Sequence, residues 1–197
     1  MRLLHTADWH LGQTLHGQSR AYEHQRFLNW LLDQIEDTGA DALIIAGDIF
    51  DVASPSSEAQ AQYYGFLAQC RRRFEDLDIV VVGGNHDSSA RLDAPSQLLW
   101  ALGIWVQGGL PLTDGDIDLV KGEVAADALM VPFVRRRELP PGVDETFHEQ
   151  DPLHRRLGGG YRELIRRLVE RVEARRRPGQ ALIATGHCYI MGGATSD

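Results

Sequence analysis

Four short polar clusters in this 197-residue chain contain side chains that can bind a metal ion, and each follows an apolar segment. In chain order they read TADWH (6–10), AGDIFD (46–51), GGNHD (83–87) and ATGH (184–187). Their donors are carboxylate oxygens, an amide oxygen and imidazole nitrogens, with no cysteine among them. Such donors suit Mn²⁺, Mg²⁺ or Fe²⁺ better than a structural zinc ion. The residue types therefore indicate a site for divalent metal ions.

Spacing within the clusters supports this interpretation. Asp8 and His10 are two residues apart, and side chains at that spacing point the same way at the end of a strand. Gly47 removes side-chain bulk directly before Asp48, which lets an ion or the backbone approach closely. Each cluster alone is explained equally well as a turn or a helix cap, but their joint occurrence favours a metal centre. The candidate ligands are Asp8, His10, Asp48, Asn85 and His187.

The segments that must position these residues alternate between strand and helix patterns. Apolar runs predict strands at 2–7, 41–48, 78–84, 103–107 and 180–187, and apolar residues at helical spacing predict helices at 21–37, 54–74, 94–102 and 161–177. We expect a hairpin or antiparallel edge between 113 and 134, and a loop over 138–160. The alternation predicts an α/β sandwich in which helices cover the sheets. Because function gathers beyond the carboxyl ends of strands in such folds, the four clusters are expected to converge.

Composition narrows the class of protein. A net charge of −8 argues against a protein that coats nucleic acid by bulk positive charge. Arginine-rich stretches at 71–73, 135–137 and 155–177 are either solvated helix faces or local phosphate contacts. No apolar run approaches the length of a membrane span, and the first residues do not resemble a signal peptide. With two cysteines and no disulfide framework, the expected location is the cytoplasm.

The order D-x-H, G-D-x-x-D, G-N-H-D and G-H resembles the calcineurin-like metallophosphoesterases. Longer stretches are similar to their SbcD-like branch, which is related to the Mre-type DNA repair nucleases: LLHTADWHLGQTLHG (3–17), DALIIAGDIFDVASPS (41–56), VVVGGNHDSSARLDAP (80–95) and GHCYIMGGATSD (186–197). The resemblance covers essentially the whole chain. It implies a sandwich of two mixed β-sheets flanked by helices.

The resemblance also implies two divalent metal ions, Mn²⁺ before Mg²⁺. Asp8 and His10 would hold the first ion, Asp48 would bridge both, and Asn85 with His187 would hold the second. The family adds one histidine per ion from a Gly-His-x-His motif, which this sequence does not contain. We therefore expect residues 1–197 to be a metallophosphoesterase domain that is incomplete at its C-terminal end and truncated before its last strands. Such a chain would lack the capping and ATPase-binding regions and would be weakly active or inactive.

The implied chemistry is phosphodiester hydrolysis by a metal-bound hydroxide. His86 is expected to be the general acid that protonates the leaving oxygen. Asp87 is expected to accept a hydrogen bond from His86 and raise its pKa, although Asp87 capping the next turn is an alternative, and both roles can coexist.

The resemblance implies a nuclease that acts on DNA ends and hairpins in repair and recombination. It would be an ATP-stimulated double-strand exonuclease and single-strand endonuclease, working as a homodimer with an SbcC-type coiled-coil ATPase. His16, Arg20 and Arg91 are the expected contacts to DNA phosphates, independent of base sequence. Apolar residues at 63–67 and 98–100 form either a dimer patch or ordinary core. The alternative functions are a nucleotide or small-molecule phosphodiesterase, and a non-catalytic dimerisation fragment.

Overall fold

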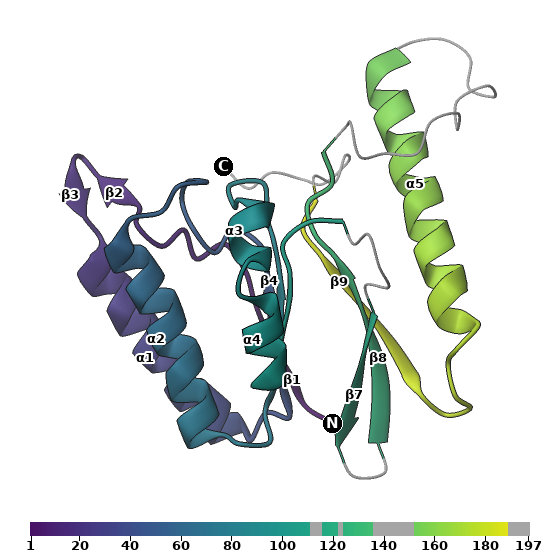
Figure 1. Ribbon diagram of the computed structural model, residues 1–197, viewed down its shortest axis with the longest axis horizontal. Helices are drawn as coiled ribbons and strands as arrows, with labels where there is room; N and C mark the ends of the chain where they lie inside the picture. The colour runs from purple at the N-terminus through teal and green to yellow at the C-terminus, as the bar shows by residue number, and fades with distance from the viewer. Residues whose placement is uncertain (111–115, 122–123, 136–151, 189–197) are drawn as a thin grey trace.

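The computed structural model describes residues 1–110, 116–121, 124–135 and 152–188, and these form four layers (Figure 1). Helices α1 (Ala21–Thr38), α2 (Ser57–Arg73), α3 (Ser89–Asp93) and α4 (Ser96–Ala101) make the first layer. Two β-sheets follow, and helix α5 (Pro152–Glu173) covers the far side. The predicted α/β sandwich of two sheets flanked by helices is confirmed.

The first sheet contains β1 (Leu3–Thr6), β4 (Ala42–Ala46), β5 (Asp78–Val82) and β6 (Ile104–Gln107). These strands are parallel and lie in the order β1-β4-β5-β6. The second sheet contains β7 (Asp116–Lys121), β8 (Val124–Val131) and β9 (Ala181–Gly186). Here β8 pairs antiparallel with β7 and parallel with β9, so this sheet is mixed whereas the described strands of the first are parallel throughout.

Alternating side chains of the inner strands build separate cores on the two faces of each sheet, because successive residues of a strand point in opposite directions. In β4, Leu43 and Ile45 pack against α1 and α2, whereas Ile44 faces the second sheet. In β8, Met130 faces the first sheet and Leu129 faces α5. The wholly apolar runs read from the sequence are therefore strands buried on both faces.

Helix ends agree with their local chemistry. The Ser56 hydroxyl accepts a hydrogen bond from the backbone N–H of Ala59 at 3.2 Å and caps α2. Gly39 ends α1 in the left-handed conformation, with φ of 56°. The predicted apolar face of α5 is confirmed, since Leu168 and Val172 pack on β8.

Three local features differ from the sequence predictions. Helix α5 begins at Pro152, although residues 152–160 were expected to be loop because of the proline and three glycines. A proline costs nothing at the first helical position, where its missing N–H has no partner in any case. The short helix α3 was not predicted, and neither was the hairpin of β2 (Thr14–Leu15) and β3 (Gln18–Ser19). Such short elements carry too few residues for a periodic pattern.

The apolar residues considered for a dimer patch are divided between core and surface. Most of them belong to the core of the first layer: Tyr63, Phe66, Leu67 and Leu99. Leu98 and Trp100 are 67% and 44% exposed. Among the described residues, no helix combines the length and apolarity that a membrane crossing requires.

Candidate metal centre

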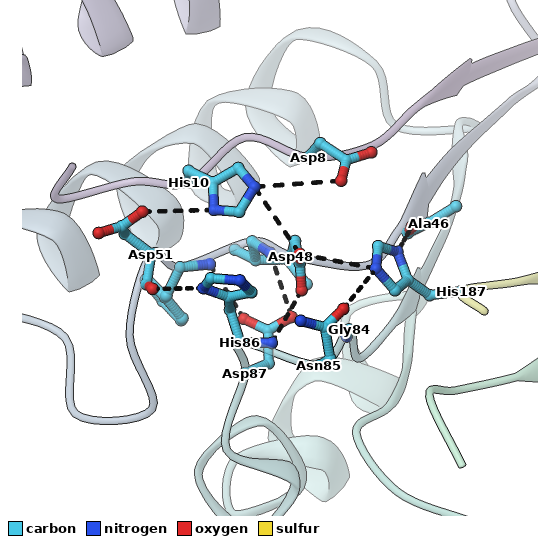
Figure 2. Close-up of polar contacts among 12 residues, drawn as sticks. Asp8, His10, Ala46, Asp48, Asp51, Gly84, Asn85, His86, Asp87 and His187 are labelled. Carbon is cyan, nitrogen blue, oxygen red and sulfur yellow. Dashed lines mark hydrogen bonds and ion pairs between the residues drawn. The ribbon is translucent and has the colours of Figure 1, made fainter. Parts of the chain in front are cut away.

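The four polar clusters meet at one edge of the sandwich, beyond the carboxyl ends of β1, β4, β5 and β9 (Figure 2). Backbone hydrogen bonds fix the clusters to one another. The N–H of Asp8 donates to the carbonyl of Gly47 at 3.0 Å, and the N–H of His10 donates to the carbonyl of Asp48 at 3.0 Å. The backbone of these loops therefore continues the register of the sheet beyond its strands.

Three of the candidate ligands have left-handed backbone conformations. The φ angles of Asp8, His10 and Asp48 are 57°, 47° and 49°. Such conformations cost non-glycine residues about 1–3 kcal/mol each and gather at functional sites. The predicted reason for the convergence of Asp8 and His10 was wrong, because β1 ends at Thr6 and strand alternation does not apply to them.

Trp9 orients its two neighbours. Its ring packs edge-on against Phe66 at 5.3 Å between centroids, and its indole N–H donates to the hydroxyl of Thr6 at 2.9 Å. Trp9 is only 5% exposed. With Trp9 in the core, Asp8 and His10 point away from the helices and toward Asp48 (Figure 2).

The carboxylate of Asp48 lies between two imidazoles. Its Oδ2 is 3.7 Å from Nε2 of His10 and 3.5 Å from Nε2 of His187. Ligands of one ion with bonds of about 2.1 Å lie about 3 Å apart. An oxygen at similar distances from two imidazole nitrogens fits the position of a ligand shared by two ions. The other oxygen of Asp48 accepts the backbone N–H of His86 at 2.9 Å, which fixes the carboxylate.

Hydrogen bonding also assigns the ring nitrogens of His187. Its Nδ1 lies 2.9 Å from the carbonyl oxygen of Ala46, an acceptor only, so Nδ1 carries the proton. Nε2 then carries the lone pair, and it lies 3.1 Å from Oδ1 of Asn85. This arrangement, in which a carbonyl orients a histidine and leaves the second nitrogen for a metal, is typical of metal ligands.

Asp51 belongs to the site and was not assigned a role from the sequence. Its Oδ1 lies 3.4 Å from Nδ1 of His10, whose Nε2 lies 4.0 Å from the carboxylate of Asp8. A carboxylate behind a ligating histidine raises the basicity of the ligand and holds the ring. The signal was present in the sequence as the last residue of the G-D-x-x-D motif. Among the described residues, potential ligand atoms gather in two groups: Asp8, Asp48 and His187, and His10, Asp51 and His86.

The calcineurin-like phosphoesterase family model matches residues 1–190. The chain belongs to this family. The predicted resemblance to its SbcD-like branch is also confirmed, by relatives that are named as the SbcD component of the nuclease SbcCD.

One of these relatives, from Rhodobacter capsulatus, is 44% identical over 149 residues, which cover 71% of this chain and 37% of the relative. Another, from Bacillus subtilis, is 36% identical over 200 residues, which cover all of this chain and 49% of the relative. The chain therefore spans about half the length of the curated relatives it matches, or less. Among solved structures, a Pseudomonas putida nuclease MPE is 20% identical, covers 74% of this chain and 57% of its own, and has a TM-score of 0.37.

Asp87 has a different role in this phosphoesterase from the one predicted. Its carboxylate is 1% exposed and accepts three backbone N–H groups, from Ile49 at 3.1 Å, Phe50 at 2.9 Å and Gly84 at 2.8 Å. The predicted hydrogen bond from His86 is absent from these contacts, so that part of the prediction was wrong. Burial raises the pKa of the Asp87 carboxyl, and the three backbone hydrogen bonds act in the opposite direction. Asp87 fastens the loop after β5 to the loop after β4.

The imidazole of His86 is exposed and turns toward the loop after β4. Its Nδ1 lies 2.7 Å from the carbonyl oxygen of Asp51. This hydrogen bond is the main reason that the pKa of His86 is raised, and the nearby charges of Asp48, Asp51 and Asp87 act in the same direction.

Two glycines make room for the ligands. A Cβ on Gly47 would overlap the imidazole of His187, and a Cβ on Gly84 would overlap Asp48. Gly47 also has a φ of 90°, which side chains rarely adopt. The predicted removal of bulk before Asp48 thus serves the approach of His187.

The three predicted DNA contacts lie around this centre, outside the ligand cluster. His16 is exposed in the turn of the β2–β3 hairpin, with φ of 50°. Arg20 is half-buried, and its guanidinium donates to the side-chain oxygen of Gln13 at 2.7 Å. Arg91 is exposed on α3 and donates to the hydroxyl of Ser54 at 3.4 Å. Their contact with DNA stays a prediction.

Gly47→Ala should weaken Mn²⁺ binding at least about tenfold, because the new methyl group displaces His187. Gly179→Ala is the matched control, since Gly179 also has a positive φ of 82° but nothing lies within 4 Å of the added Cβ. Both variants carry the same backbone strain, so only the steric overlap differs. Calorimetric titration with MnCl₂ measures the affinities. Equal affinity in the two variants would contradict the positioning of His187 by Gly47.

Asp87→Asn should lower the free energy of unfolding by about 1–3 kcal/mol, because the amide NH₂ must face a backbone N–H that the carboxylate now accepts. Urea denaturation followed by circular dichroism measures the change. Asp37→Asn, at an exposed position, should stay within about 0.5 kcal/mol of the parent. An unchanged unfolding midpoint for Asp87→Asn would show that its hydrogen bonds do not hold the two loops together.

Proposed function

We propose that this chain is the metal-binding part of a DNA nuclease subunit that hydrolyses phosphodiester bonds with two divalent metal ions. The observation that carries the proposal is the buried carboxylate of Asp48 between the imidazoles of His10 and His187. Oxygen and nitrogen donors favour Mn²⁺, with Mg²⁺ as the alternative.

The ligand assignment follows from the distances. Asp8 and His10 hold one ion, Asn85 and His187 hold the other, and Asp48 is shared. Ions bound there supply Lewis acidity to the phosphodiester and lower the pKa of water. Five protein donors leave several positions around two six-coordinate ions to other groups, and we therefore expect weak hydrolysis by this chain alone.

His86 is the proposed proton donor to the leaving oxygen. Its ring is exposed at the centre, and the hydrogen bond to the carbonyl of Asp51 raises its pKa and favours the protonated form. Asp87 acts on His86 through the backbone, because it holds the loop that carries the ring.

The proposed substrate is duplex DNA with free ends or hairpins, and the proposed process is DNA repair and recombination in the cytoplasm. Support comes from the relatives named as the SbcD component of the nuclease SbcCD, which also suggest an SbcC-type coiled-coil ATPase as partner and ATP-stimulated exonuclease and endonuclease activities. A homodimer is part of the proposal. Exposed Leu98 and Trp100, beside the half-buried Tyr64, are the side chains that remain for a dimer patch.

Asp48→Asn should weaken the binding of both Mn²⁺ ions, whereas Asp8→Asn should weaken only one, because Asp48 is the shared ligand. The expected loss is at least about tenfold per affected ion. Calorimetric titration of the 197-residue chain with MnCl₂ gives the number of ions and their affinities. Asp33→Asn is the control, since Asp33 pairs with Arg73 away from the centre. Two undiminished binding events in Asp48→Asn would overturn the shared-ligand assignment.

Cleavage assays identify the substrate class. Hydrolysis of bis(p-nitrophenyl) phosphate tests phosphodiesterase chemistry alone, whereas Mn²⁺-dependent shortening of an end-labelled duplex tests the nuclease. Hydrolysis of the small ester together with an intact duplex would favour a nucleotide or small-molecule phosphodiesterase.

His86→Gln should lower kcat for phosphodiester hydrolysis about 10²–10⁴-fold, the usual contribution of a general acid. Glutamine preserves size and hydrogen bonding but cannot donate a proton to the leaving group. Mn²⁺ affinity should change little, because His86 is not among the proposed ligands. A retained kcat would exclude the role of general acid, and a lost Mn²⁺ affinity would make His86 a ligand instead.

A further inference from the structure

The β2–β3 hairpin contributes nothing to the core, yet its backbone is fixed to the metal centre. All six residues from 14 to 19 are exposed. At its base, the N–H of Gln13 donates to the carbonyl of His10 at 3.0 Å, and the N–H of Arg20 donates to the carbonyl of Gln13 at 3.2 Å. The guanidinium of Arg20 also holds the side chain of Gln13. A hairpin of two isolated strands is marginal by itself, so these bonds decide its position relative to the ligand His10.

The turn of the hairpin is tight and strained. Thr14 pairs with Ser19 and Leu15 pairs with Gln18, which leaves His16 and Gly17 as a two-residue turn. Their φ angles are 50° and 76°, as a turn that matches the twist of the strands requires. Glycine adopts this conformation freely and histidine does not. The strain and the anchoring together present Leu15 and His16 at a rigid tip, at the end of the molecule where the loops of the metal centre lie (Figure 1).

The chemistry of the tip suits bases better than phosphates. Residues 13–19 contain no lysine, arginine, aspartate or glutamate. Contacts to the DNA backbone rely on cations, whereas amides, hydroxyls and apolar side chains contact base edges and base faces. Leu15 is 60% exposed, and leucine is one of the side chains that proteins insert between or against base pairs.

We infer that the β2–β3 hairpin is a wedge that contacts the terminal base pair of a duplex, with Leu15 against the base face. This inference rests on the proposed nuclease function and assigns the substrate contact to a duplex end. It differs from the predicted phosphate contact by His16, because the tip meets a base and its contribution does not depend on charge. The wedge separates the terminal pair and leads the strand from the hairpin base toward His10.

The test uses a duplex with 2-aminopurine in its terminal base pair and linkages that resist hydrolysis at its ends. Binding by the parent chain should raise the 2-aminopurine fluorescence, because the base leaves the stack. Leu15→Ala should lose most of this rise and should bind the duplex, measured by anisotropy, roughly fivefold more weakly, the order of effect of removing one side-chain contact to a base. Leu98→Ala, which truncates an equally exposed leucine elsewhere, should behave as the parent.

The outcomes separate the inference from the function it rests on. A full fluorescence rise in Leu15→Ala, or binding by the parent without any rise, overturns the wedge and leaves the nuclease proposal standing. Failure of the parent to bind the duplex overturns both. Weaker binding by Leu15→Ala that disappears at higher salt, with the fluorescence rise intact, would also overturn the wedge, because it would assign the tip to phosphates.

Discussion

The carboxylate of Asp48 is a buried anion, and the surrounding loops are arranged to keep it in one position. It is 4% exposed, and a charge removed from water needs compensation by hydrogen bonds and opposite charge. The N–H of His86 supplies one hydrogen bond, and the imidazoles of His10 and His187 flank the other oxygen. The left-handed backbone of Asp48 and the bare backbone of Gly84 both serve this position. The remaining compensation is what a pair of divalent cations would supply.

The site depends on the packing of the two sheets against each other. His187 follows β9 in the second sheet, whereas the other candidate ligands follow strands of the first. Ile44, Val80 and Met130 form the apolar layer between the sheets, and this layer sets how far His187 lies from Asp48. Backbone hydrogen bonds lock the edge, since the N–H of Phe133 donates to the carbonyl of Gly83 at 2.8 Å. A shift of one sheet against the other would therefore alter the metal centre directly.

Rigidity is unevenly distributed around the centre. Asp87 ties the loops after β4 and β5 together through three buried hydrogen bonds, and Trp9 anchors the loop after β1 in the core. The reactive groups stay accessible on this frame, since Asp8 and His86 are exposed. Fixed backbone with exposed side chains is what positioning of a substrate requires, because misplacement by about 1 Å costs rate.

The sequence by itself determined the donor atoms, the α/β class and the edge at which the donors meet, because these follow from local patterns: apolar runs mark buried strands, and polar clusters mark their carboxyl ends. It did not determine the partners of individual atoms. The carboxylate of Asp87 accepts backbone N–H groups in place of the His86 ring, and the carbonyl of Ala46 selects the free nitrogen of His187 from 141 residues away. Only the tertiary structure decided these contacts. Their partners are distant in sequence, and their geometry depends on how two sheets and several strained loops pack together.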